Sequence, residues 1–391
     1  MSIIAAILVL GAIVFFHELG HFLAAKLFGV GVLEFSIGMG PRILSIVFRN
    51  TRYSLKLLPL GGSCAMLGED SAGSGDFLCA SGTESGDGIL DYEGVRFREA
   101  ELLRRSFRNR PNWQRFVICI AGVFHNFLLA FLLAIVVCHF SGFDKPIMLG
   151  TEAEAPAAGM IQEGDLLRTI SYDGKHERRI RSFRDLYIYL YLHSGEFTKD
   201  TRVSIGYERA GNAGLGSAVF APYYDGASGR YRLGISFYSG RVRAANVPEL
   251  LEDACYELLY NVRVVFDSLQ LLVHGRVERN ELMGPVGTVS VIGSTVEASS
   301  RYGLFNAFLV LLELSVMLSA NLGVMNLLPI PALDGGRLLF ILLEMLTRRR
   351  LDPKIEERIN QVGMALLLLL MLLLLSNDIF NVLTGAYKNI I

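Results

Sequence analysis

The chain has 391 residues, of which 52% are hydrophobic and 19% are charged, and its formal net charge is -1 at pH 7. A mean hydropathy of +0.40 is too high for an ordinary soluble domain, although the charged residues leave room for water-exposed parts. The near-neutral charge gives no indication of nucleic-acid binding. Composition therefore predicts a multi-pass α-helical membrane protein with at least one soluble insert.

The first apolar segment carries the sequence His17-Glu18-Leu19-Gly20-His21. Two histidines four residues apart lie one turn apart on the same helix face, so their imidazoles converge on one Zn²⁺. The glutamate between them is then placed to act as a general base that activates water, and it does not ligate the metal. Ionisable groups in a membrane helix are costly without a partner, which favours a functional role for this motif.

Four segments are long enough to cross a bilayer at roughly 20 residues each. Basic residues gather between spans one and two and between spans three and four, which predicts that both of these connections are cytoplasmic. The first segment lacks a basic start and a small-residue cleavage site, so we interpret it as a permanent span and not as a signal peptide. The four spans are expected at residues 3–28, 116–140, 304–328 and 362–383.

Residues 31–67 alternate around glycine and proline, a pattern that predicts β-hairpins and not helix. Two interpretations remain open. The segment is either a simple interfacial hairpin, or it dips back beside the first span and offers a strand edge to an extended peptide. Residues 70–95 are rich in Gly, Ser, Asp and Glu, a composition that predicts a mobile surface loop.

The segment between spans two and three predicts a small α+β domain. Its run from Glu154 to Leu167 contains Pro-Ala-x-x-Gly-Met-x-x-Gly-Asp, followed by a strand at 168–170 and a serine-capped helix from Ser182. This order resembles the PDZ domains of bacterial proteases, which bind extended peptides by strand addition. Residues 247–275 then predict an amphipathic helix that lies near the membrane without crossing it.

A zinc hydrolase site needs three protein ligands and one open position, so a third ligand must come from elsewhere. The third span ends in the run from Asn326 to Arg337, where two prolines forbid a regular helix and make the chain break and restart near Asp334. A carboxylate at such a junction can reach a neighbouring helix, which makes Asp334 the best candidate for the third ligand. Two alternatives remain: Asp334 only caps the following helix, or His125 of the second span supplies the ligand.

The second span also contains Asn126. A buried asparagine bonds either a substrate backbone and the developing oxyanion, or a neighbouring helix. Glu313 and Asn321 in the third span need partners as well, and their spacing does not identify them.

Taken together, these motifs resemble the site-2 protease family. They are HELGH in the first span, the GxGP and PLGG hairpin, AGxxxN in the second span, the PDZ-like insert, the Gly-Pro-Val-Gly of residues 284–287, and NLLPIPALDGG. The ordered set is most similar to the bacterial regulator of sigma-E protease group. The departures are Val123 in place of a frequent proline, Met283 in place of a serine, one PDZ-like copy where many relatives carry two, and a longer loop at 70–95.

The resemblance implies an intramembrane zinc metalloendopeptidase of the bacterial inner membrane. Its substrates would be transmembrane segments of anti-sigma factors and remnant signal peptides, with the PDZ-like domain on the extracytoplasmic side of the membrane and the active site toward the cytoplasm. Its partners would be these substrates, the lipid bilayer and a peptide ligand of the PDZ-like domain. The residues that the resemblance assigns are His17, His21 and Asp334 as zinc ligands, Glu18 as the base, and Asn126 as a substrate or oxyanion contact, with Asn326 as a further contributor to the site.

Two other functions compete with this one. A non-enzymatic PDZ scaffold with a relict metal site should have lost a ligand or the base, and a transporter has no need of a glutamate between the histidines. The expected parts are span one with its motif at 1–28, the hairpin region and loop at 29–111, span two at 112–140, the PDZ-like domain at 144–240, the amphipathic helix and connector at 247–300, span three and its Leu-Asp-Gly segment at 303–347, and span four at 361–385.

Overall fold

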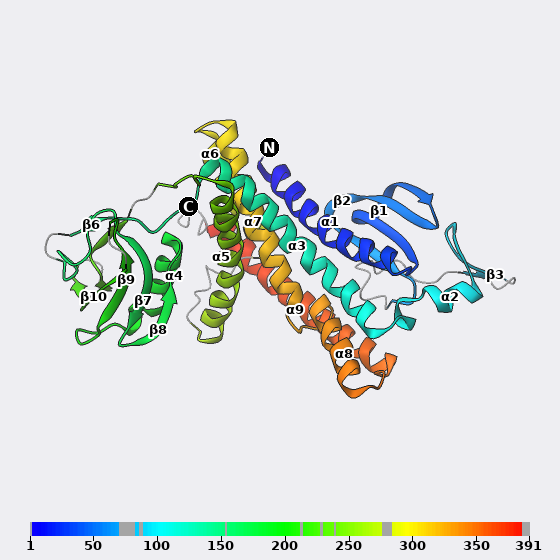
Figure 1. Cartoon of the computed structure of the whole chain (residues 1–391). Helices are drawn as coiled ribbons and strands as arrows, with labels where there is room; N and C mark the ends of the chain where they lie inside the picture. The colour runs from blue at the N-terminus through cyan, green and yellow to red at the C-terminus, as the bar shows by residue number, and fades with distance from the viewer. Residues whose placement is uncertain are drawn as a thin grey trace. The chain divides into compact units, whose positions relative to one another are not determined.

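The computed structural model describes two compact units, shown as one ribbon in Figure 1. The first unit comprises Met1–Ala134 and Asn261–Ile391, and the second comprises Ile135–Tyr260. Glu154, Met283 and most of the predicted loop at 70–95 lie outside the described residues. The described ranges are 2–69, 83–85, 89–152, 155–211, 214–226, 230–237, 240–275 and 284–384.

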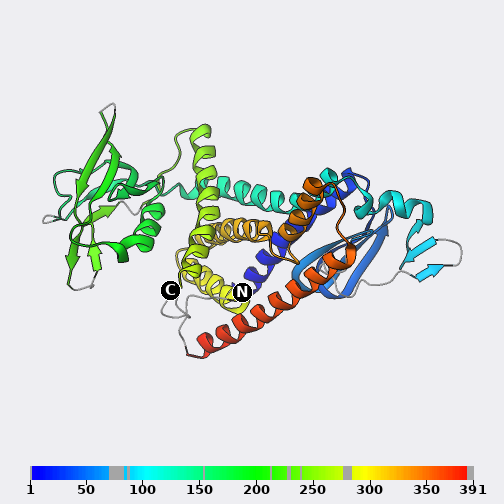
Figure 2. The ribbon, with the colours of Figure 1, turned by 90° about the horizontal axis from the view of Figure 1, so that it is seen from below.

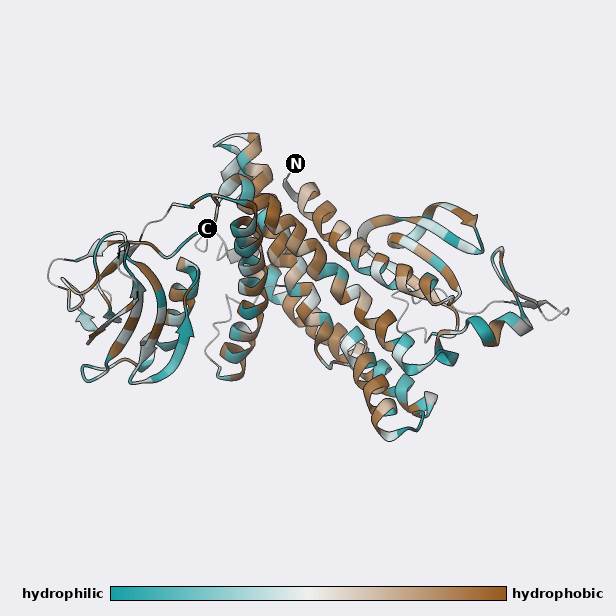
Figure 3. Cartoon of the chain, in the orientation of Figure 1, coloured by the Kyte–Doolittle hydropathy of each residue, from teal (hydrophilic) through white to brown (hydrophobic). Residues whose placement is uncertain are grey.

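Within these ranges, four helices are long and apolar enough to cross a membrane, and Figure 3 shows their predominantly hydrophobic colouring. The candidate spans agree with the sequence prediction for the first three helices, whereas the fourth helix begins earlier than the predicted span because polar residues extend its first turns. The helices are α1 (Ser2–Leu27), α3 (Asn112–Ser141), α7 (Leu304–Leu327) and α9 (Pro353–Thr384).

Residues 31–67 form β-structure after α1, as the sequence predicted, and are called the hairpin below. Residues 34–37 pair both with 62–65 and with 52–55, and residues 52–55 pair in turn with 44–47, so the segment folds into a small sheet. Strands β1 (Val32–Phe48) and β2 (Thr51–Met66) are joined at Arg49 and Asn50, whose φ angles of 47° and 57° suit a two-residue hairpin turn. The half of the hairpin beside α1 is buried, and it holds the carboxylate of Glu34 against the guanidinium of Arg42, at 2.8 and 2.9 Å. Residues 42–48 of β1 are exposed and mostly apolar.

A core shared by α1, the hairpin, α3 and α8 (Asp334–Thr347) fixes the positions of these elements. Ala25, Val32, Ile118 and Ile341 are each at most 1% exposed and belong to one hydrophobic cluster. The shorter elements between the hairpin and α3 are β3 (Thr83–Ser85), β4 (Ile89–Tyr92), β5 (Val95–Arg98), α2 (Glu99–Arg105) and the 3₁₀ helix η1 (Phe107–Asn109).

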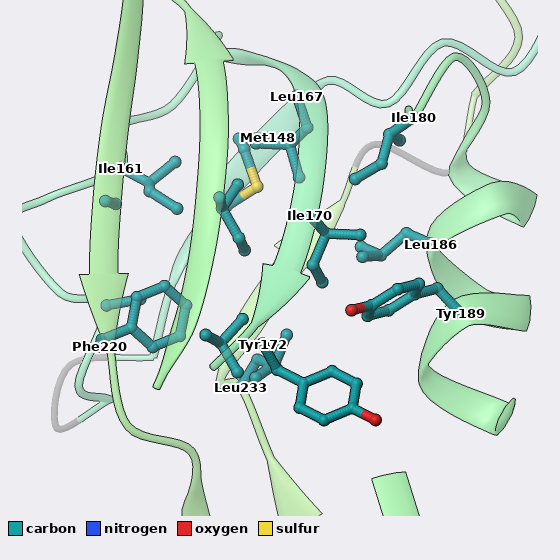
Figure 4. Close-up of a cluster of buried hydrophobic side chains, with 14 of the residues drawn as sticks. Met148, Ile161, Leu167, Ile170, Tyr172, Ile180, Leu186, Tyr189, Phe220 and Leu233 are labelled. Carbon is teal, nitrogen blue, oxygen red and sulfur yellow. The ribbon is translucent and has the colours of Figure 1, made fainter. Parts of the chain in front are cut away.

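The second unit contains the expected small α+β domain. Its main sheet is antiparallel with strand order β10-β9-β7-β8, and α4 packs its apolar side chains against this sheet (Figure 4). The predicted serine cap is present, because Ser182 Oγ accepts a hydrogen bond from the backbone N–H of Asp185 at 3.2 Å. The elements are β6 (Met148–Thr151), β7 (Leu166–Tyr172), β8 (Lys175–Arg179), α4 (Phe183–His193), η2 (Ser194–Glu196), β9 (Val203–Glu208), β10 (Leu215–Phe220), β11 (Tyr223–Asp225), β12 (Arg230–Arg232) and β13 (Ile235–Phe237).

The predicted amphipathic helix is α5 (Val247–Val273), whose residues to 260 belong to the second unit and whose remainder belongs to the first. The Gly-Pro-Val-Gly motif opens α6 (Pro285–Ser300). There the backbone N–H groups of Gly284 and Gly287 both donate to the buried carboxylate of Asp378, each at 2.8 Å. Figure 2 shows the C-terminal end of α9, in red, lying beside α6. This motif therefore joins the start of one helix to the end of another.

Candidate metal centre

The two histidines of α1 and a carboxylate from α8 (Asp334–Thr347) converge at one point. His17 Nε2 lies 3.0 Å from Asp334 Oδ2, and His21 Nε2 lies 3.2 Å from the same oxygen. The two Nε2 atoms are 3.2 Å apart. Ligands about 2.0–2.1 Å from a tetrahedral zinc ion are about 3.3 Å from one another, so this set of two imidazoles and one carboxylate fits zinc.

Asp334 reaches this point because the chain breaks between α7 and α8, as its prolines predicted. Helix α7 ends at Leu327 and α8 begins at Asp334. A Cβ built on Gly335 would lie 2.0 Å from the carbonyl oxygen of Leu328, so only glycine permits this close return of the backbone. Asp334 is not the cap of α8, because the N-cap position belongs to Leu333 and Asp334 directs Oδ2 to the histidines.

One face of α3 lies against both histidines. The Nδ1 of His21 is 2.8 Å from the carbonyl oxygen of Ile118, to which it donates when Nε2 faces the metal. One turn later, a Cβ on Gly122 would lie 2.3 Å from His21 Nε2 and 2.7 Å from His17 Cε1. One turn further, the side-chain amide of Asn126 lies 3.1 Å from His17 Nδ1. The sequence analysis missed the role of Ile118 because a backbone carbonyl has no residue signature.

The remaining residues singled out in the sequence occupy distinct places around this centre. Glu18 is half-buried and lies beside β2, with its Cγ 3.4 Å from the Cβ position of Gly62. Asn326 Nδ2 is 3.4 Å from His17 Nε2, on the side where the three ligands converge. Asn126 is fully buried on the opposite side of the His17 ring. His125 Nδ1 contacts the carbonyl oxygen of Ala121 at 2.9 Å, and this histidine is not part of the converging set.

A buried ion pair connects α8 to the end of the hairpin region. The guanidinium of Arg337, one turn after Asp334, donates to the carboxylate of Glu69. The other carboxylate oxygen of Glu69 accepts the backbone N–H of Met66 at 3.0 Å. Glu69 is 3% exposed, and loss of either partner of a buried pair leaves an uncompensated charge. This pair therefore fixes the position of α8 relative to the end of β2, the strand that lies beside the metal centre.

The family model for peptidase family M50 matches residues 5–370 of the chain. The chain belongs to this family. It is similar to the zinc metalloprotease RasP of Geobacillus kaustophilus, with 31% identity over 97% of each chain. It is also similar to the regulator of sigma-W protease RasP of Bacillus subtilis, with 28% identity over 97% of this chain and 98% of that protein.

Among solved structures, the solution structure of the second domain of the Listeria protein Lin2157 covers 25% of this chain and 86% of its own, with 22% identity and a TM-score of 0.19.

Membership in peptidase family M50 makes the protein a zinc metalloprotease and a multi-pass membrane protein. It is thus an enzyme and neither of the two competing classes, the scaffold and the transporter. The cofactor expected from the sequence is zinc, and the cluster of His17, His21 and Asp334 supplies a donor set of the right chemistry for it.

Proposed function

We propose that this M50 protease is an intramembrane endopeptidase that cleaves transmembrane segments of membrane proteins. One observation carries the proposal: the two histidines proposed as zinc ligands and the glutamate proposed as the base lie on α1, a helix long and apolar enough to span the bilayer. A soluble substrate would have no access to a metal centre that lies within the bilayer. Anti-sigma factors and remnant signal peptides are the substrate classes, in keeping with a relative named regulator of sigma-W protease.

The proposed zinc ligands are His17, His21 and Asp334. When bound, zinc supplies a Lewis acid that polarises the scissile carbonyl and acidifies a water molecule. Glu18 accepts a proton from the attacking water and returns it to the leaving amine. Asn326 donates an N–H to the oxyanion that develops on the carbonyl, because its amide faces the side where the ligands converge.

Asn126 was predicted to contact substrate or the oxyanion, and we do not carry that role into the proposed mechanism. Its side chain is 0% exposed, and its amide contacts the His17 nitrogen that faces away from Asp334. An oxyanion donor has to reach the reacting carbonyl, which lies on the other side of the His17 ring.

The β1–β2 hairpin is the proposed substrate-presenting element. A helical peptide bond is inaccessible to hydrolysis, so the substrate has to unwind near the metal, and an extended segment adds to an unpaired strand edge. Strand β2 passes beside Glu18, which brings such an edge close to the proposed base. Residues 42–48 of β1, which are exposed and mostly apolar, are suited to the lipid interface.

The proposed location is the bacterial inner membrane, with the PDZ-like domain outside and the active site toward the cytoplasm. The basic residues between spans one and two and between spans three and four support this orientation. The PDZ-like domain binds an extended peptide, either a substrate terminus or a separate ligand.

The test is Glu18→Gln in the purified full-length protein. Loss of a general base costs about 10²–10⁴-fold in rate, so cleavage of a labelled single-span substrate should fall by at least that range while zinc content stays at the wild-type level. Glu297→Gln, on the exposed surface of α6, is the matched control and should cleave normally.

Mass spectrometry of the products then locates the cut. Cleavage inside the apolar segment of the substrate is the expected result. Wild-type rates from Glu18→Gln would contradict the assigned base, and cuts confined to water-exposed segments of the substrate would contradict the intramembrane activity.

A further inference from the structure

The amide of Asn126 lies next to a proposed zinc ligand and not next to the reaction space. It is 3.1 Å from His17 Nδ1, and Asn126 is 0% exposed. With Nδ2 facing the ring, Asn126 Oδ1 is buried and has no hydrogen-bond partner among the described residues. A buried amide oxygen without a partner is costly, and the two ends of an amide side chain are interchangeable by a half-turn.

The chemistry of metal ligation decides which end faces His17. The Nε2 of His17 points at Asp334 and at the other histidine, so Nε2 is the atom offered to zinc and has to be free of its proton. A neutral imidazole then carries its proton on Nδ1. The group 3.1 Å from Nδ1 must therefore accept a hydrogen bond, and in Asn126 only Oδ1 can do so.

His21 has the corresponding arrangement with a different acceptor. Its Nδ1 faces the carbonyl oxygen of Ile118 at 2.8 Å, and Ile118 is also 0% exposed. Ile118 and Asn126 lie two turns apart on the same face of α3, with Gly122 between them. Each histidine thus has one buried acceptor behind it, both supplied by one helix.

We propose that Asn126 is a positioning residue that accepts the Nδ1 proton of His17 through Oδ1, and thereby fixes the tautomer and the ring orientation in which Nε2 binds zinc. This rests on the proposed zinc ligands, and it gives Asn126 a role without substrate contact. The hydroxyl of Ser319 on α7 donates to the backbone carbonyl of Asn126 at 2.8 Å, a contact that does not involve the side-chain amide of Asn126.

The test measures zinc affinity, which is independent of proteolysis. Purified full-length variants are titrated with Zn²⁺ against a competing chelator, and the Co²⁺-substituted proteins provide an absorption spectrum that reports ligand geometry. Removing the hydrogen-bond partner of a metal-bound histidine costs about 10–100-fold in affinity, so we expect that loss for Asn126→Leu. Asn126→Asp should retain near wild-type affinity, because a carboxylate accepts the same proton.

Control variants separate positioning from packing. Ser319→Ala removes a buried hydrogen bond from the same turn without touching His17, and it should leave zinc affinity unchanged. If Asn126→Leu does not fold, Asn126→Ala removes the amide without adding bulk, and the same loss is expected.

Wild-type affinity in Asn126→Leu would overturn the inference. So would a loss in Asn126→Asp as large as that in Asn126→Leu, because the defect would then come from packing. A His17→Ala variant that still binds zinc normally would instead contradict the proposed ligand set, so the two failures are distinguishable.

Discussion

Replacing Gly122 with alanine should remove zinc from the protein. The added methyl carbon would lie 2.3 Å from His21 Nε2 and 2.7 Å from His17 Cε1, distances shorter than real Cβ contacts show. Reaching an ordinary contact of 3.4 Å requires a shift of about 1 Å, whereas metal ligands tolerate about 0.2 Å. Either the histidines move, or α3 shifts away from them and the hydrogen-bond acceptors of both rings shift with it.

The expected effect of this substitution is the opposite of what Gly→Ala does at an ordinary position in a helix. Without a clash, Gly→Ala in a helix stabilises by about 0.5–1 kcal/mol. We therefore expect Gly122→Ala to lose zinc in metal analysis and to lose at least about 10²-fold in cleavage rate, the cost of a misplacement of about 1 Å.

Gly195→Ala is the matched control, since a Cβ on Gly195 meets no atom within 4 Å. It should keep full zinc content and activity. A Gly122→Ala protein with stoichiometric zinc and a raised melting temperature would refute the claim that α3 touches the ligands.

Three further predictions concern other parts of the molecule. Gly335→Ala places a methyl carbon 2.0 Å from the carbonyl oxygen of Leu328, so we expect metal analysis to show loss of zinc, and a fully loaded variant would be contrary evidence. Asp378→Ala removes two hydrogen bonds from the start of α6 and should lower the free energy of unfolding by about 2–4 kcal/mol, with a smaller loss for Asp378→Asn in the same denaturation experiment. Burial raises the pKa of the Asp253 carboxyl to about 6, against about 3.9 in an unfolded chain, so this group makes folding less favourable as the pH rises from about 4 to 6. Asp253→Asn should therefore stabilise the protein at about pH 7.5 more than at about pH 5, and an equal gain at both values would argue against a buried charge.

The proposed zinc ligands were predictable because each has a strong local signature. The spacing of His17 and His21 defines a helix face, and the two prolines before Asp334 force a break in the chain. The structure brings these side chains together from positions 313 apart in sequence. Neither periodicity nor composition shows which residues so far apart in the sequence meet in the fold. The sequence therefore identified Asp334 as a candidate ligand but could not show that it lies beside the histidines.

The groups that contact the proposed ligands were harder to predict, because they act through a backbone atom or through the lack of a side chain. Ile118 contributes a carbonyl oxygen and Gly122 contributes the lack of a side chain. Gly122 and Asn126 are four residues apart, a spacing that places them on one helix face, but the spacing does not identify the histidine that lies against that face. Asn126 was accordingly predicted to face substrate, and its contact with His17 could be found only from the structure.

The wide separation of the proposed ligands has a consequence for biosynthesis. At about 5–20 residues per second, a ribosome needs about 15–60 s to proceed from His21 to a residue 313 positions later. Throughout that interval the nascent chain holds two histidines and the glutamate without the carboxylate that completes the donor set. With the proposed ligand set, the protease therefore cannot complete its zinc site until its own synthesis is nearly finished.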